Sequence, residues 1–121
     1  MMFLTLPIPD KALSPNARPH WAAKARAAKQ ARHQGHAAVL ISGQAAPAPP
    51  LVMHVAWYSK SAHPNHRTDD DNMWSSLKNH RDGIADGLGV NDRDIRQGRM
   101  VYGVDKARPR VEITVEAQAG E

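Results

Sequence analysis

Residues 51–58 read Leu-Val-Met-His-Val-Ala-Trp-Tyr, and residues 70–88 read DDNMWSSLKNHRDGIADGL. In the first stretch every second residue, beginning with Leu51, is a large apolar one. This alternation predicts a half-buried or fully buried β-strand. The second stretch predicts a helix over Asp70–Leu88, because six of its apolar residues fall within one helical arc of about 120°. These six are Met73, Trp74, Leu77, Ile84, Ala85 and Leu88. A strand followed by an amphipathic helix indicates a sheet with helices packed on it.

The flanking segments extend this pattern in both directions. We expect a strand at Phe3–Ile8, a helix from about His20 to Leu40, and a hairpin of two strands, Arg99–Val104 and Arg110–Ala117. Trp21, Val39 and Leu40 are expected to pack the first helix, and all three tryptophans are expected in the core. The predicted order is β-α-β-α-β-β, an α/β (α+β) fold with a mixed sheet and two main helices. Residues 1–121 are expected to form a single domain, with 42–50 as a loop.

Composition narrows the class of protein. The chain has 121 residues and no cysteine, which excludes a disulfide scaffold, cysteine-based zinc sites and thiol catalysis. No run of apolar residues is long enough for a membrane span, and the N-terminus lacks the features of a signal peptide. We therefore expect a cytoplasmic protein, in a bacterium or a phage-infected host, that does not insert into a membrane.

Charge is distributed unevenly along the chain. Residues 1–60 contain seven Lys and Arg against one acid, whereas the remainder contains nine against eleven. Three of those acids are consecutive, Asp69, Asp70 and Asp71. A basic surface attracts phosphate, and clustered carboxylates repel it unless a divalent cation lies between them. The pattern favours metal-dependent phosphate chemistry, and the alternative is a solubilising acidic turn.

Asp71, Ser75, Lys78 and Asp82 form a polar line beside the apolar arc of the second predicted helix. Eleven residues of helix span about 16 Å, so Asp82 cannot share one metal ion with Asp71 in the same chain. Lys78 is closer, and its ammonium group is expected to approach a phosphate held above the aspartates. These residues alone favour equally a second explanation for the three aspartates. Carboxylates in the first turn of a helix interact favourably with the helix dipole and so stabilise the helix.

Two motifs carry a resemblance to a known family. The run Asp69-Asp70-Asp71-Asn72, the downstream Lys78 and the segment DGIADGLGVND over 82–92 resemble the RusA family of Holliday-junction resolvases, common in phages and prophages. The segments LTLP at 4–7 and LSPNARPHW at 13–21 resemble the N-terminal part of that family. Together the matching segments cover most of the chain, and the combination is more specific than the D-x-D-N run alone.

The resemblance implies a small α/β homodimer that cuts branched DNA, the four-way junction, with Mg²⁺ held by acidic residues. By position, Asp69, Asp71 and Asp92 match the metal-binding catalytic acids and Lys78 matches the catalytic lysine. Two positions depart from the family pattern: Ser75 stands where some members place the lysine, and Asn91 replaces the first acid of a frequent Asp-Asp pair. Because residues i and i+2 of a helix point apart, Asp69 is expected before or at the helix cap.

DNA binding is expected to come from the N-terminal half, through Asn16, Arg18, His20, Lys24 and Lys29. The structural alternative for the basic residues of the first helix is a solvated face. Two alternatives to a junction resolvase remain open: a non-catalytic, structure-selective DNA-binding protein of the same fold, and a related nuclease that prefers flaps or other branched DNA.

Overall fold

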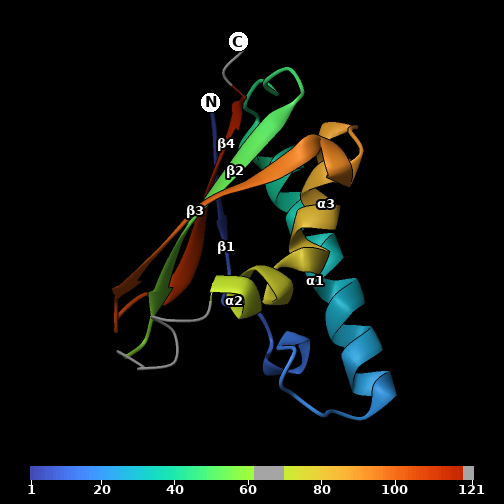
Figure 1. The fold of residues 1–121 in the computed structure, drawn as a ribbon, viewed down its shortest axis with the longest axis vertical. Coiled ribbons are helices and arrows are strands. Elements are labelled where there is room, and N and C mark those ends of the chain that lie inside the picture. The colour runs from blue at the N-terminus through green and yellow to red at the C-terminus, as the bar shows by residue number, and fades with distance from the viewer. Residues whose placement is uncertain (62–69, 119–121) are drawn as a thin grey trace.

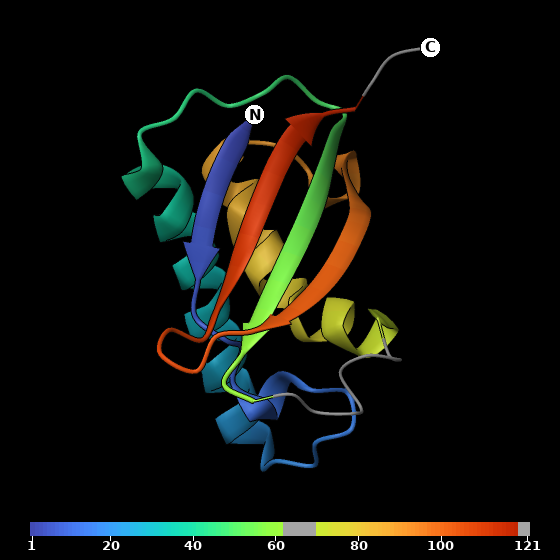
Figure 2. The same cartoon turned by 90° about the vertical axis from the view of Figure 1, so that its left-hand side faces the viewer.

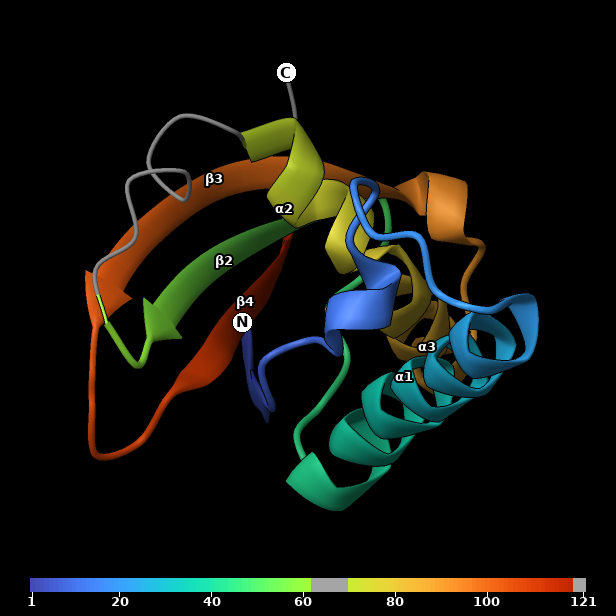
Figure 3. The same ribbon diagram turned by 90° about the horizontal axis from the view of Figure 1, so that it is seen from below.

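The computed structural model describes residues 1–61 and 70–118, which form one four-stranded sheet with the helices on one of its faces (Figures 1 and 3). The α+β class predicted from the sequence is confirmed. Within these residues, no helix combines the length and the apolar character that a membrane crossing requires. The elements are β1 (Met2–Leu6), a 3-10 turn (Lys11–Leu13), α1 (Trp21–Ser42), β2 (Leu51–Ser59), α2 (Asp70–Ser76), α3 (Lys78–Leu88), a 3-10 turn (Asp92–Asp94), β3 (Ile95–Val104) and β4 (Arg110–Ala117).

The sheet is mixed, as predicted, but its pairing differs from the prediction. The strand order is β1-β4-β2-β3, with β2 and β3 parallel and the other pairs antiparallel. The predicted hairpin of the last two strands is therefore wrong, because β2 lies between β3 and β4 (Figure 2). The physical reason is backbone pairing: β2 hydrogen-bonds to β3 along one edge and to β4 along the other, so both of its edges are satisfied and the last two strands are separated. β3 also begins at Ile95, four residues before the predicted start.

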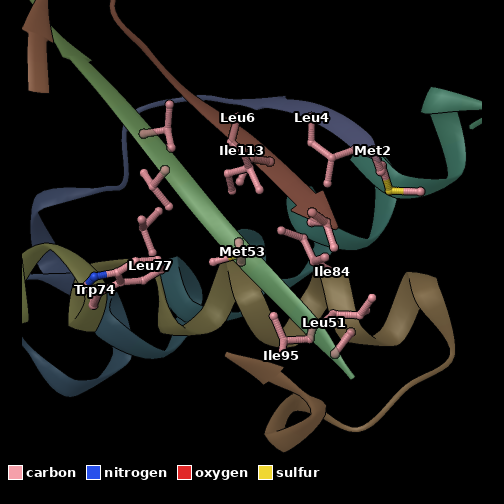
Figure 4. Close-up of a cluster of buried hydrophobic side chains, with 14 of the residues drawn as sticks. Met2, Leu4, Leu6, Leu51, Met53, Trp74, Leu77, Ile84, Ile95 and Ile113 are labelled. Atoms are coloured by element: carbon pink, nitrogen blue, oxygen red, sulfur yellow. The ribbon is translucent and has the colours of Figure 1, made fainter. Parts of the chain in front are cut away.

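The core lies between the sheet and the helices. Figure 4 shows residues of β1, β2 and β4 facing Leu77 and Ile84 of the helical layer. Trp57 and Trp74 are buried, as predicted. Trp21 and Leu40 are not: 77% and 64% of their surfaces are exposed, so both core assignments are wrong. Val39 is buried, as predicted, and α1 otherwise packs through a row of small residues, Ala27, Ala31 and Gly35.

α1 and α3 pack so closely that glycine is required at their contact. A Cβ atom added at Gly83 of α3 would lie 1.9 Å from the backbone oxygen of Arg32 in α1. One added at Gly35 of α1 would lie 2.2 Å from the backbone oxygen of His80 in α3. Both distances are far below van der Waals contact, so these glycines fix the separation of the two helices and hence the position of α3 against the sheet.

His80 is buried in the same contact, with 1% of its surface exposed. Its Nε2 donates to Oε1 of Gln34 at 2.9 Å, while its Nδ1 is buried and has no hydrogen-bond partner in the described part of the chain. A second proton on the ring would place an unsatisfied charge in the interior. Burial accordingly lowers the pKa of His80 from 6.5 to about 4.

The protein is therefore expected to lose stability in mild acid. Unfolded chains would protonate His80 below pH 6.5, whereas the folded protein resists until about pH 4. The contribution of the neutral His80 ring to stability is fully present above pH 6.5. The free energy of unfolding is therefore expected to fall by about 2 kcal/mol between pH 7.5 and pH 5. Urea unfolding at both pH values measures this loss. His33→Gln, a change at an exposed histidine of α1, should keep the same pH dependence. Equal free energies of unfolding at the two pH values would contradict the assignment.

Candidate functional site

A break in the helical segment shapes the candidate site. The single helix predicted over Asp70–Leu88 is divided at Leu77 into α2 and α3, whose axes point in different directions (Figure 1). The hydroxyl group of Ser76 donates to the backbone oxygen of Asn72 at 2.9 Å, a side-chain bond that bends helices. The amide of Leu77 is shared between the carbonyls of Met73 and Trp74, which tightens the turn.

The break creates an open groove of about 250 Å³, here called the Lys78 groove. It is lined by Asp71, Trp74, Ser75, Lys78, Arg81 and Gln97. Three members of the predicted polar line, Asp71, Ser75 and Lys78, are thus brought together. Arg81 and Gln97 were not among the predicted site residues. Arg81 follows Lys78 by one helical turn, a spacing that could have identified it.

The two cations of the Lys78 groove make no direct ion pair in the described part of the chain, although both interact electrostatically with Asp82. Lys78 and Arg81 have no ion-pair partner within residues 1–61 and 70–118, whereas Arg32 and Arg110 are both bound to carboxylates. The Nε atom of Arg81 is buried and lacks a hydrogen-bond acceptor among the described residues. An anion bound in this groove would be stabilised by the positive charges of Lys78 and Arg81, which line it.

A second groove, here called the Asp92 groove, is acidic and measures about 310 Å³. Asp82, Asp86 and Asp92 line it together with Arg32. Arg32 is bound to Asp86 by two hydrogen bonds of 2.6 and 2.9 Å, which raises the pKa of Arg32 and lowers the pKa of Asp86. Partial burial, and then the negative charge of Asp92, raise the pKa of Asp82. The cation of this groove is already paired, so its net field repels phosphate.

The structure does not bring Asp71 and Asp92 together. Asp71 lies in α2, and Asp92 begins the 3-10 turn beyond the far end of α3 (Figures 1 and 2). The 11 residues of α3 span about 16 Å, whereas two ligands of one Mg²⁺ lie about 3 Å apart. Among the described residues, no three acidic or histidine side chains are grouped to hold a metal ion. Asp69 lies outside the described residues.

A β-bulge brings β3 residues to the site. Gly98 and Arg99 together oppose His54 of β2, so the pairing shifts between Met53–Gln97 and Val55–Met100. Nδ1 of His54 accepts from the amide of Arg99 at 3.0 Å, and its Nε2 lies 3.1 Å from Oε1 of Glu116.

The shift has a consequence for the side chains of β3. It allows both Gln97 and Tyr102 to face the helices, and the Tyr102 hydroxyl donates to Asp70 of α2. This bulge cannot be found from sequence periodicity, because alternation assumes two residues per repeat.

The predicted DNA-binding residues are exposed and lie near the start of α1. Asn16 and Arg18 lie in the segment before α1, Lys24 and Lys29 lie on α1, and all four are exposed. His20 caps the helix, with its Nδ1 accepting from the amide of Ala22 at 3.2 Å. The start of α1 and α2 both lie in the lower half of the molecule in Figure 1, and Figure 3 shows them on different sides of it.

Comparisons with known proteins give one relative. An "Uncharacterized protein" of Xylella fastidiosa (strain Temecula1) is 43% identical over 94 residues, which cover 77% of this chain. The match covers 61% of that relative, so the chain spans less than two thirds of its length. No protein-family model matches the chain.

Proposed function

We propose that this protein is a Mg²⁺-dependent endodeoxyribonuclease that resolves Holliday junctions. One observation carries the proposal: the Lys78 groove combines the carboxylate of Asp71 with two cations that have no ion-pair partner in the described residues. Phosphodiester hydrolysis needs positive charge beside the phosphate and a hard oxygen ligand for a divalent ion. The resemblance of the acidic motif, Lys78 and residues 82–92 to RusA resolvases supports branched DNA as the substrate.

The oxygen donors in the Lys78 groove fit Mg²⁺. Proteins usually bind this ion through one or two carboxylates, with water and substrate phosphate completing the coordination. Asp71 supplies one carboxylate, and Asp69 is the proposed second. Bound Mg²⁺ would lower the pKa of a coordinated water molecule and offset negative charge on the phosphate. Asp92 belongs to a different groove, so we no longer place it in the ligand set of Asp71 within one chain.

Each side chain of the Lys78 groove has a distinct role in this proposal. Lys78 and Arg81 bind the phosphate that is to be cleaved and stabilise the negative charge that develops on it. Gln97 can donate a hydrogen bond to a phosphate oxygen from the opposite wall of the groove, which fixes the orientation of the strand. Asn16, Arg18, His20, Lys24 and Lys29 would hold the adjoining arm through its phosphates.

Assembly and location are also part of the proposal. A junction must be cut on two opposed strands, and a twofold homodimer would present one Lys78 groove to each strand. A cytoplasmic location would give such an enzyme access to DNA.

Nick mapping on synthetic DNA tests the proposal. The protein is incubated with Mg²⁺ and an end-labelled four-way junction, a flap or a linear duplex that share one strand. Paired nicks on opposed strands of the junction, at a rate well above that on the linear duplex, are the expected result. Faster cleavage of the flap would favour the related nuclease, and intact DNA in every lane would contradict nuclease activity.

The separation of Asp71 from Asp92 favours a second candidate, a non-catalytic and structure-selective DNA-binding protein. Such a protein needs the basic segment but no shared metal site. It would bind the junction equally well in Mg²⁺ and in EDTA and would leave the DNA intact. The same incubation, read on a native gel, therefore distinguishes the two candidates.

A further inference from the structure

Trp21 is an exposed tryptophan at the first position of α1. Its surface is 77% exposed, whereas Trp57 and Trp74 are 5% and 8% exposed. The ring of His20 lies beside it, with 5.5 Å between the ring centroids and 33° between the planes. The two rings are neighbours and tilted relative to each other, and the exposed indole of Trp21 offers a flat aromatic face rather than a pocket.

The charge around Trp21 indicates the kind of partner. Exposed Arg18 and Lys24 flank it, and Asp10 is the only acid in residues 1–60. The other end of α1 provides a contrast, since Leu40 and Ile41 are exposed there but residues 33–59 contain no Lys or Arg. An aromatic ring among cations matches single-stranded nucleic acid, which presents an unstacked base next to a phosphate.

We propose that Trp21, assisted by His20, stacks on an unpaired nucleobase of bound DNA. Any base has a flat face that can stack, so the contact would select for unpaired structure rather than for sequence. The start of α1 and α2 both lie in the lower half of the molecule in Figure 1, so we place the stacked base on the same DNA molecule that enters the Lys78 groove. The inference rests on DNA binding, which is part of the proposed function, but not on cleavage.

Fluorescence titration with an oligothymidylate of 15 nucleotides tests the contact in EDTA. Because the other two tryptophans are buried, stacking on Trp21 is expected to quench the exposed fraction of the emission. Because substitution of Trp21 removes this fluorophore, the affinities of the variants are measured by the anisotropy of a dye-labelled oligothymidylate. Trp21→Ala should weaken binding about 5- to 150-fold, the range for loss of one stacked base. Trp21→Phe retains an aromatic face and should restore most of the affinity. Ile41→Ala removes an equally exposed apolar residue and should have no effect.

The outcomes separate this inference from the nuclease proposal. Weaker binding by Trp21→Ala with rescue by phenylalanine supports stacking, even if the wild-type protein never cleaves DNA. Unchanged affinity of Trp21→Ala overturns the inference, even if the junction is cleaved. An effect of Trp21→Ala on self-association in sedimentation, without an effect on oligothymidylate affinity, would overturn it in favour of a protein partner.

Discussion

Asp71→Asn is expected to slow nicking of the four-way junction by at least about 100-fold, while junction binding in EDTA stays unchanged or becomes tighter. The carboxylate of Asp71 is the proposed metal ligand of the Lys78 groove, and a loss of about 2.7 kcal/mol of transition-state stabilisation corresponds to this factor. Binding should not weaken, because the substitution removes a negative charge that lies next to Lys78 and Arg81 and repels phosphate.

Single-turnover nicking and gel-shift titration measure the two effects separately. Asp94→Asn is the matched control, since it makes the same change at an exposed acid outside the Lys78 groove and should behave as the wild-type protein. Asp71 is itself exposed, so its replacement should leave the unfolding midpoint in place. Equal nicking rates for Asp71→Asn and the wild-type protein would show that the chemistry occurs elsewhere.

Gly83→Ala is expected to destabilise the protein by about 3 kcal/mol. Helix propensity alone predicts the opposite sign, because alanine in place of glycine inside a helix stabilises by about 1 kcal/mol. Steric contact decides the sign here: the new Cβ would lie 1.9 Å from the Arg32 carbonyl oxygen and 2.9 Å from the His36 amide nitrogen. Both neighbours are backbone atoms of α1, so the whole helix must move and uncover part of the core.

Urea unfolding of the purified variant measures this loss. Ala25→Gly, at an exposed position of α1, gives the propensity effect without a steric effect and should destabilise by about 1 kcal/mol. A Gly83→Ala protein too unstable to purify would agree with the steric argument if Ala25→Gly remains folded. A variant that is more stable than the wild-type protein would show that α1 and α3 are not in close contact.

Local sequence patterns predicted the strands and the buried face of the segment that forms α2 and α3, but not the buried face of α1. Alternation identifies β2 because Leu51, Met53, Val55 and Trp57 all point to the core. The periodicity of 3.6 residues identifies Leu77 and Ile84 for the same reason, although it cannot show the bend between them. The order of the strands was not predictable from these patterns. It depends on pairing between segments that are far apart in the chain: β2 pairs with both β3 and β4 and therefore lies between the last two strands.

The candidate site was predictable to the extent that it is local. Asp71 and Ser75 lie one turn apart on α2, and Lys78 begins α3 directly after the break at Leu77, so the three residues share a groove. The contribution of Gln97 was not predictable, since it depends on a bulge in β3 and on the pairing with β2. The position of Asp92 was not predictable for a similar reason. Asp92 lies beyond the C-terminal end of α3, so the length of this helix separates Asp92 from Asp71 and places the two residues in different grooves.

Exposure of Trp21 shows a further limit of sequence patterns. A tryptophan in an alanine-rich helix is expected to be buried, because few other residues of that helix are large. Burial also requires another element to cover the residue, and the first turn of α1 leaves Trp21 uncovered among the described residues.

The most direct test of the account is the addition of Mg²⁺ to a complex of protein and four-way junction that has been formed in EDTA. Every junction is bound before the ion is added, so the rate of nicking reports chemistry and not association. We expect paired nicks on opposed strands to follow the addition of Mg²⁺, and to be reduced at least about 100-fold in the Asp71→Asn complex. A complex that remains bound and uncut after Mg²⁺ is added would contradict the assignment of this protein as a nuclease.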